Sequence, residues 1–231
     1  MSLVLCLSPA TQASAVTSST FASQSGRQIL SAAMSAALNL ASCTSTSATK
    51  ISGQAYSSIT NSAMTTGQQT LVVGAAWTVV RVVGGVAYIK ENSTAMREQF
   101  SVNDPKADNR WISIPHSNSN FARFSTYILL PSMLSEMAPS GTLKTTKTTT
   151  VNHRRVVGVT GKPNIHLGLA SGTETVYVSV SLPHVPVELV ASDVVQGQRQ
   201  TFVITYTNWG RDFRIAKPSP VIAITSTKLP S

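Results

Sequence analysis

The first regular pattern in the chain is helical and begins at Ser25. Ser25 and Gln28 have the spacing of a capping box, in which the two side chains bind backbone amides at the start of a helix. Apolar side chains then recur at helical spacing, at Leu30, Met34, Ala37, Leu38 and Ala41. Because apolar residues cover more than half of this helix, we expect it to pack tightly against a sheet.

From Cys43 the pattern changes to the period of two that is typical of β-strands. The clearest case is TVVRVVGGVAYIK, residues 78–90, where Gly84 and Gly85 separate two β-branched runs. A two-residue glycine connection predicts a hairpin with a type I′ or II′ turn. The valines on either side of Arg81 leave few polar positions. We therefore expect both faces of this hairpin to be covered, one of them by an apolar group that is not always present.

The middle of the chain mixes short helices with a loop and a strand. We expect a short helix at 92–100, a turn-rich loop at 104–109, a strand at 110–115 and a helical region at 119–137. Pro131 breaks or restarts that helical region, because proline lacks the amide hydrogen that a helix interior needs.

The rest of the chain again has the pattern of strands. Asn152 and His153 form a second two-residue hairpin connection. The expected strands lie at 142–151, 154–160, 174–181, 185–192, 198–210 and 212–220. Together with the earlier runs this makes about ten strands in consecutive antiparallel order, and a sheet of that width curls. The predicted fold class is α+β, a curved antiparallel half-barrel wrapped over the N-terminal helix and the mid-chain helical segment.

The termini are expected to lie outside one folded domain. Ala13-Ser14-Ala15 follows a short apolar run and has the form of a signal-peptidase site, so residues 1–15 are interpreted as the remnant of a signal peptide. We expect a flexible linker at 16–24, a single domain at 25–225 and a C-terminal tail at 226–231. No apolar run reaches the ~20 residues of a transmembrane helix.

Composition and charge narrow the class of protein. The 231 residues are 42% hydrophobic but only 12% charged, a profile typical of a secreted or envelope β-protein. The net charge of +9 is scattered along the chain, which argues against nucleic-acid binding and indicates weak peripheral contact with anionic membranes. The first acidic residue is Glu91.

No pattern of chemistry-bearing residues indicates catalysis. The four histidines have no metal-ligand spacing, and no nucleophile or phosphate-binding motif is present, so we expect no enzyme, metal or cofactor. A catalytic pair of His116 with Glu136 is the remaining enzymatic alternative. Of the two cysteines, Cys43 is interpreted as a small buried hydrophobe, with acylation as the alternative for Cys43 or Cys6.

The order of motifs resembles the LppX/LprAFG-type lipoprotein family of actinobacteria and, more distantly, the LolA/LolB lipoprotein carriers. The resemblance spans residues 25–225. Its motifs are SATKISG, VVRVVGGVAYIK, RWISIP, VNHRRVVGVTG, TVYVSV, LPHVPVELV and YTNWGRDFRIAKPSP. It implies a half-barrel over helices with an apolar cavity, and binding or transport of acylated lipids or glycolipids in the cell envelope. The chain departs from the family in lacking a convincing lipobox and in placing His153 in a turn.

The leading hypothesis is a non-enzymatic, monomeric, secreted or envelope protein that holds a lipid, glycolipid or acylated ligand in that cavity. Anchoring to the membrane would follow if a cysteine is acylated. The alternative is a structural or sensory extracytoplasmic module that binds a protein or a cell-wall polymer. The residues expected to line the cavity, with ordinary core packing as the alternative, are Leu30, Met34, Leu38, Val80, Val82, Phe121, Phe124, Tyr127, Ile128, Leu134 and Met137.

Overall fold

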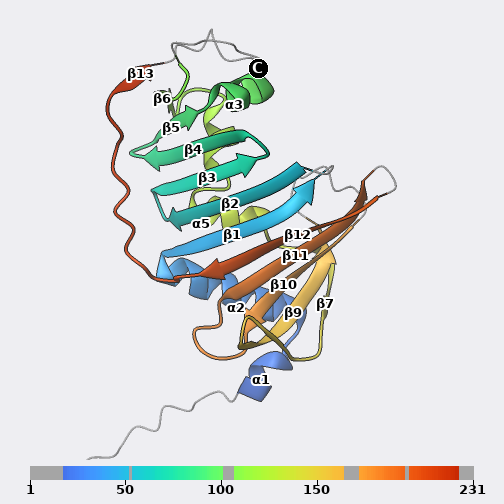
Figure 1. Ribbon diagram of the computed structural model, residues 1–231. Helices are drawn as coiled ribbons and strands as arrows, with labels where there is room; N and C mark the ends of the chain where they lie inside the picture. The colour runs from blue at the N-terminus through green and yellow to red at the C-terminus, as the bar shows by residue number, and fades with distance from the viewer. Residues whose placement is uncertain (1–17, 52–53, 101–106, 164–171, 196–197, 224–231) are drawn as a thin grey trace, which may run out of the picture.

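The computed structural model describes residues 18–51, 54–100, 107–163, 172–195 and 198–223. In these residues five helices lie on one side of a thirteen-stranded sheet or at its ends (Figure 1). The helices are α1 (Ser18–Ala22), α2 (Gly26–Leu40), α3 (Ser93–Phe100), α4 (Phe121–Ser125) and α5 (Leu130–Glu136). The strands are β1 (Ser42–Ile51), β2 (Gln54–Ala63), β3 (Gly67–Val73), β4 (Ala76–Val83), β5 (Val86–Glu91), β6 (Trp111–Pro115), β7 (Ser140–Thr145), β8 (Thr149–Val151), β9 (Arg154–Lys162), β10 (Thr173–Ser179), β11 (Pro186–Val195), β12 (Gln198–Thr207) and β13 (Val221–Ala223).

The sheet consists of two antiparallel meanders that meet where β1 pairs with β12. One meander runs from β1 to β6 and the other from β12 back through β11, β10 and β9 to β7, with β8 also paired to β9. The predicted class is confirmed, because the mostly antiparallel sheet curves around the helices and its edge strands β7 and β13 stay apart (Figure 1). The predicted consecutive order of about ten strands is wrong: β1 lies between β2 and β12, and β13 pairs in parallel with β6.

The N-terminal helix forms as the capping box predicts. The Gln28 amide donates to Ser25 Oγ at 3.4 Å, and the Ser25 amide donates to Gln28 Oε1 at 3.1 Å. The helix ends at Ala41, whose left-handed backbone (φ 63°) lets its N–H bond to two carbonyls of the last turn. Its buried face consists of Gly26, Ile29, Leu30, Ala33 and Ala37. The small residues on this face allow α2 to approach the sheet closely.

The linker predicted at 16–24 is wrong for its described part. Residues Ser18–Ala22 form α1, and Phe21 is only 3% exposed. The Phe21 ring stacks on His184, with the ring centroids 3.7 Å apart and the planes nearly parallel. His184 also binds the Ser179 carbonyl through Nδ1 at 3.1 Å, so it is held in the structure and is not a free loop residue. Burial of the Phe21 ring, which removes a large apolar area from water, helps to hold this segment against the domain.

The helical region predicted at 119–137 is divided into two short helices. The break lies at residues 126–129, ahead of Pro131, which occupies the first turn of α5. Proline is tolerated there because the amide it lacks has no partner within the helix. Pro131 therefore restarts the helix, and the short segment between α4 and α5 lies over the start of β3.

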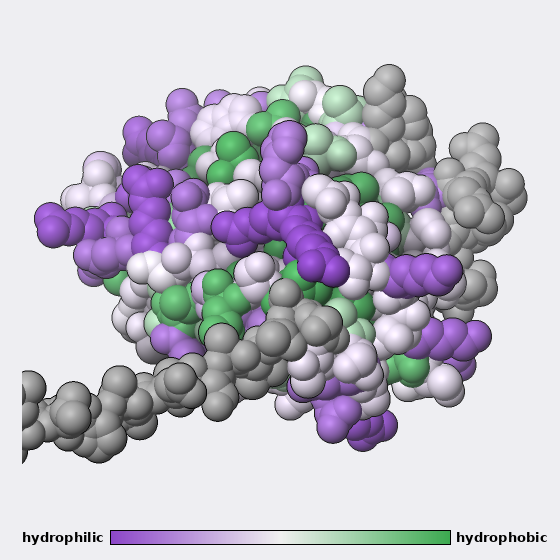
Figure 2. All heavy atoms as spheres, turned by 90° about the horizontal axis from the view of Figure 1, so that it is seen from below, coloured by the Kyte–Doolittle hydropathy of each residue, from purple (hydrophilic) through white to green (hydrophobic). Residues whose placement is uncertain are grey.

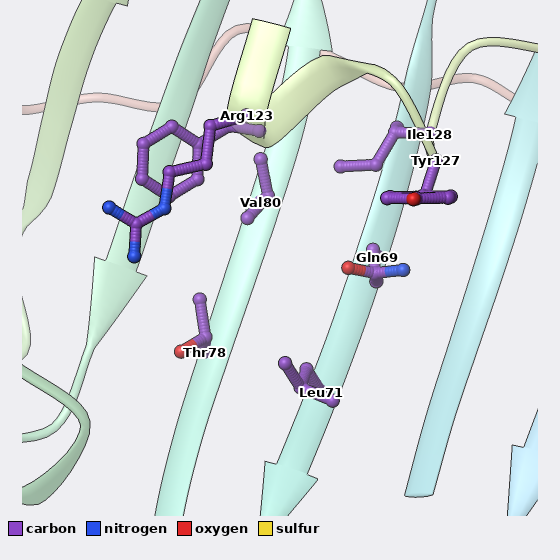
Figure 3. Close-up of a pocket in the computed structure, with 8 residues that line it drawn as sticks. Gln69, Leu71, Thr78, Val80, Arg123, Tyr127 and Ile128 are labelled. Atoms are coloured by element: carbon purple, nitrogen blue, oxygen red, sulfur yellow. The ribbon is translucent and has the colours of Figure 1, made fainter. Parts of the chain in front are cut away.

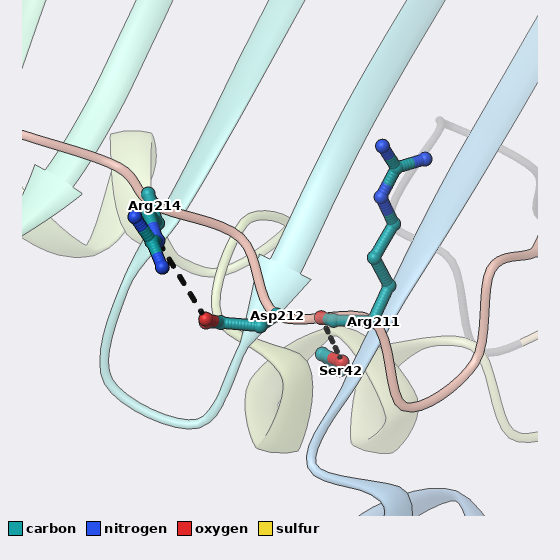
Figure 4. A network of polar contacts seen from close by, with 4 residues as sticks. All are labelled: Ser42, Arg211, Asp212 and Arg214. Atoms are coloured by element: carbon teal, nitrogen blue, oxygen red, sulfur yellow. Dashed lines mark hydrogen bonds and ion pairs between the residues drawn. The ribbon is translucent and has the colours of Figure 1, made fainter.

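The strand predicted at 212–220 is wrong, because this segment crosses the sheet as an irregular connection from β12 to β13. Pro218 and Pro220 remove amides that a strand would need for pairing. Hydrogen bonds hold the start of the segment: Ser42 Oγ donates to the Arg211 carbonyl at 2.7 Å (Figure 4). Asp212 and Arg214 face each other at 3.9 Å, but both are exposed, so this ion pair contributes little stability.

Candidate functional site

Apolar side chains between the helices and the concave face of the sheet form two separate clusters. The large cluster lies under α2 and α5, against β9 to β12 and the start of β1. The small cluster lies under α4, against β4 to β6; it consists of Val80, Val82, Ala87, Ile89, Ile114, Phe121, Phe124 and Ile128. The concave face of β1 to β3 lies between the two clusters.

A pocket of about 110 Å³ borders the small cluster on the concave face (Figure 3). Its floor comes from β3 and β4, and its other walls come from α4 and the segment that follows it. The lining residues are Gln69, Leu71, Thr78, Val80, Arg123, Phe124, Tyr127 and Ile128. The pocket is smaller than the ~300–1,000 Å³ of ordinary small-molecule sites. In this structure it therefore has room for only part of a ligand.

The concave face of β1 to β4 carries polar side chains, whereas the sequence analysis predicts an apolar cavity. Cross-strand partners lie on the same face of a sheet, and the register aligns these residues beside the apolar residues of the pocket. We call this set the polar row; it consists of Ser45, Ser47, Ser58, Thr60, Ser62, Gln69 and Thr78. The space between the clusters is thus lined by hydroxyl and amide groups as well as by apolar side chains.

Hydrogen bonds within the polar row use only part of the donors and acceptors of its side chains. Gln69 Nε2 donates to Thr60 Oγ1 at 3.0 Å, and the hydroxyls of Ser47 and Ser58 are 2.8 Å apart. Ser62 Oγ donates to the sulfur of Met133 at 3.5 Å, which is a weak acceptor. Each hydroxyl can also accept hydrogen bonds, so the row keeps bonding capacity for a further group.

A buried carboxyl group lies at the β5 end of the polar row. Glu91 is 2% exposed, and Thr78, its cross-strand partner, donates to Glu91 Oε1 at 3.1 Å. No described residue makes a hydrogen bond with Glu91 Oε2. Burial raises the pKa of Glu91 to about 7, although the Thr78 hydroxyl and the charge of Arg123 both lower it.

The structure distributes the predicted cavity residues among different places, and their role in binding stays a prediction. Val80, Phe124, Tyr127 and Ile128 line the pocket. Val82 and Phe121 belong to the small cluster but do not line the pocket. In or against the large cluster lie Leu30, Met34, Leu134 and Met137. Leu38 is 37% exposed and belongs to neither cluster.

Sequence reasoning missed the polar part of the site, namely Gln69, Thr78, Glu91 and Arg123. A signal for Glu91 was present, because strand alternation places it on the same face as Ala87 and Ile89. An acidic residue on the apolar face of a strand marks a buried carboxyl. Arg123 had no comparable signal, since its position depends on how α4 packs over the sheet.

Other candidate chemistry is not assembled by the fold. In the described part of the chain, no three His, Cys, Asp or Glu residues are grouped so as to hold a metal ion. His116 is exposed at the end of β6 and contacts the ring of Phe121, whereas Glu136 is in the last turn of α5. Within the described residues, no helix has the length and hydropathy to cross a membrane.

The Cys43 thiol is fully buried in the large cluster, and desolvation raises its pKa to about 12. This agrees with the interpretation of Cys43 as a small buried hydrophobe. Cleavage before Cys43, as lipoprotein acylation requires, would remove α2 and its buried residues Ile29, Ala33 and Ala37. Cys6 lies outside the described residues.

Comparisons with known proteins identify a similar fold but no activity. No protein-family model and no curated protein sequence matches the chain. The fold is similar to that of LprF from Mycobacterium bovis, with a TM-score of 0.53 and 16% identity over 84% of this chain and 97% of LprF. A DUF1329 family protein from Desulfovibrio piger matches at a TM-score of 0.28 and 7% identity, covering 78% of this chain and 91% of that protein. The match to LprF confirms the resemblance at the level of the fold.

Proposed function

We propose that the protein binds an amphiphilic lipid, glycolipid or acylated ligand between its curved sheet and the α4–α5 segment, without catalysing a reaction. The observation that carries this proposal is the pocket on the concave face, whose apolar wall continues into the small cluster. The fold shared with LprF supports it, because the family that the sequence resembles carries acylated lipids and glycolipids. The same resemblance supports a place in the cell envelope or outside the cell.

The hydrophobic effect supplies the affinity that such binding needs. Each methylene group removed from water contributes about 0.8 kcal/mol, so a long alkyl chain gains on the order of 10 kcal/mol. A protein that shields the chain therefore needs an apolar surface and no reactive group. Tyr56 and Phe202 lie on the concave face beyond the pocket and are each partly exposed, so the available apolar surface is longer than the pocket itself.

An alkyl chain requires more room than the pocket offers in this structure. Phe124 and Tyr127 are the large side chains on the helical side of the pocket. They belong to the five-residue helix α4 and to the irregular segment after it. We infer that the ligand displaces these side chains, while the sheet stays in place.

Native mass spectrometry of gently purified protein tests the proposal, followed by titration with a dansylated fatty acid. A co-purifying amphiphile, or saturable binding of the fatty acid at one site, is expected. Protein that is always free of ligand and does not bind the fatty acid would contradict the proposal.

A second candidate function, docking of a protein or polymer, is favoured by apolar residues on the convex face. Ile59 is 56% exposed and Val72 is 37% exposed, on the neighbouring strands β2 and β3. Viewed from below, by contrast, the described surface shows hydrophobic residues only in small groups between hydrophilic ones (Figure 2). Replacing Ile59 with Ser would weaken such docking and leave the binding of a fatty acid unchanged.

A further inference from the structure

The start of β9 carries a cluster of basic side chains. His153 is in the two-residue turn between β8 and β9, and Arg154 and Arg155 follow it; all three are exposed. Lys147, also exposed, lies in the connection between β7 and β8, next to Thr146, whose Oγ1 accepts a hydrogen bond from the Gly158 amide of β9 at 2.9 Å. Residues 140–162 contain five Lys and Arg residues and no acidic residue, so this edge of the sheet is cationic.

The acidic residues of the adjoining strands β10 and β11 compensate little of this charge. Glu174 is fully buried on β10, and Asp193 lies towards the far end of β11. Glu188 is half-buried and accepts a hydrogen bond from Asn152 Nδ2 at 3.2 Å. An anionic partner is therefore attracted to the start of β9.

An exposed leucine lies beside these cations. Leu182, in the connection between β10 and β11, is 79% exposed, more than any other large hydrophobic residue in the described part of the chain. The Val180 amide donates to the Arg155 carbonyl at 3.0 Å, so the connection adjoins the arginine pair. This end of the molecule is the lowest in Figure 1, and the view from below shows hydrophilic side chains projecting from it (Figure 2).

The connection that carries Leu182 is held by its own hydrogen bonds. Ser179 Oγ donates to the Ser181 carbonyl at 2.9 Å and accepts from the Ser181 amide at 3.2 Å. On the other side of Leu182, the Val185 amide donates to the Pro183 carbonyl at 2.8 Å, and the His184 ring stacks on Phe21 of α1. The backbone is thus fixed before any partner arrives, which lowers the entropy cost of inserting Leu182 into one.

The combination of cations with an exposed leucine favours a membrane over a charged polymer. Anionic head groups attract arginine and lysine side chains near the membrane surface. Beneath the head groups, the acyl chains offer an apolar layer in which a leucine side chain leaves water. A soluble polyanion supplies the charge but has no such layer, so it would leave Leu182 exposed.

We propose that this end of the molecule docks on an anionic lipid membrane. The docking surface consists of Lys147, His153, Arg154, Arg155 and Leu182; the basic side chains contact the lipid phosphates and Leu182 enters the layer below them. The inference goes beyond the proposed function, because membrane docking requires no ligand in the pocket.

Cosedimentation of the full chain with lipid vesicles tests the docking surface. The protein should bind mixed phosphatidylglycerol and phosphatidylcholine vesicles about ten-fold or more tightly than pure phosphatidylcholine, and added salt should weaken this binding. Arg154→Gln and Arg155→Gln should each weaken it about five-fold and reduce its dependence on salt. Leu182→Ser should weaken it about ten-fold and leave the dependence on salt unchanged.

Two matched controls change the same groups elsewhere. Arg97→Gln removes an exposed charge from α3, at the opposite end of the molecule in Figure 1, and Ile59→Ser removes an exposed apolar side chain from β2. Both should bind the mixed vesicles as the wild type does, and circular dichroism should show that all variants are folded.

Three results would overturn the docking surface. The first is equal binding to both kinds of vesicle, and the second is a loss in Arg97→Gln as large as that in Arg154→Gln, which would assign binding to the charge of the whole molecule. The third is wild-type binding in Leu182→Ser together with displacement by soluble polyphosphate, which would indicate a polyanion site. Fatty-acid titration is a separate measurement, so the proposed function stands or fails independently of these results.

Discussion

Gly67 lies directly against Ile128, at the point where the segment after α4 meets the first residue of β3. A Cβ atom on Gly67 would be 2.5 Å from Ile128 Cγ2 and 2.6 Å from the Ile128 carbonyl oxygen. Such distances are below van der Waals contact, so only glycine allows this approach. The contact fixes the height of the segment above the sheet and thereby sets the depth of the pocket that Ile128 lines.

Gly67→Ala is therefore expected to lower the free energy of unfolding by about 1–3 kcal/mol, because the backbone at Ile128 must move outward. The same movement should change the affinity for a bound fatty acid. Denaturant unfolding and fatty-acid titration measure the two effects. Gly74→Ala is the control: its Cβ meets nothing within 4 Å, so any cost comes from its positive φ (56°), and fatty-acid binding should stay as in the wild type. A wild-type affinity in Gly67→Ala would show that the contact does not shape the pocket.

Glu91 makes the stability of the protein depend on pH near neutrality. Its pKa rises from 4.5 to about 7 on folding, so the folded state binds the proton more tightly than the unfolded state. The stability from this group is complete below pH 4.5 and falls as the pH rises to about 7, by about 3 kcal/mol in total. The free energy of unfolding should therefore depend on pH across this range in the wild type but not in Glu91→Gln. The control Glu98→Gln alters an exposed carboxyl and should keep the pH dependence of the wild type. If the free energy of unfolding of Glu91→Gln changed with pH as in the wild type, a group other than Glu91 would cause the pH dependence.

Phe124→Ala is expected to change the stability of the protein and its affinity for a fatty acid in opposite directions. Removing a buried ring costs about 3–5 kcal/mol, but here it also enlarges the pocket. The variant is expected to be less stable and to bind the fatty acid more tightly. Phe21→Ala removes a ring of similar burial in the large cluster and should lose stability without a gain in affinity. Weaker binding in Phe124→Ala would indicate that the ring is a contact for the ligand and not an obstacle.

The Cys43 thiol should be unreactive in the folded protein. It is fully buried and its pKa of about 12 leaves almost no thiolate at pH 8. In a Cys6→Ser variant, iodoacetamide should modify Cys43 only after denaturant is added, as measured by peptide mass spectrometry. Rapid modification without denaturant would mean that the large cluster opens readily.

Local patterns predicted those parts of the fold that local interactions determine. The capping box at Ser25 and Gln28 places the start of α2, and Gly84 and Gly85, both with positive φ, form the turn between β4 and β5. The pairing of β1 with β12 joins residues at opposite ends of the chain, so no local pattern could predict it.

The site was predictable only in its apolar half. Val80 and Phe124 follow from strand and helix periodicity, which marks buried faces. The polar row was missed because alternating Ser and Thr in β1 and β2 do not show which face is inside when both faces are polar. The concave face there is identified by the pairing with β3 and by the position of Met133, which accepts a hydrogen bond from Ser62.

Binding of an alkyl chain on the concave face is tested most directly by NMR of the methyl groups with a bound fatty acid. Intermolecular NOEs are expected between the alkyl protons and the methyl groups of Leu71, Val80 and Ile128, which line the pocket. NOEs to Ile59 and Val72 on the convex face, with none to the pocket methyl groups, would contradict the proposed function.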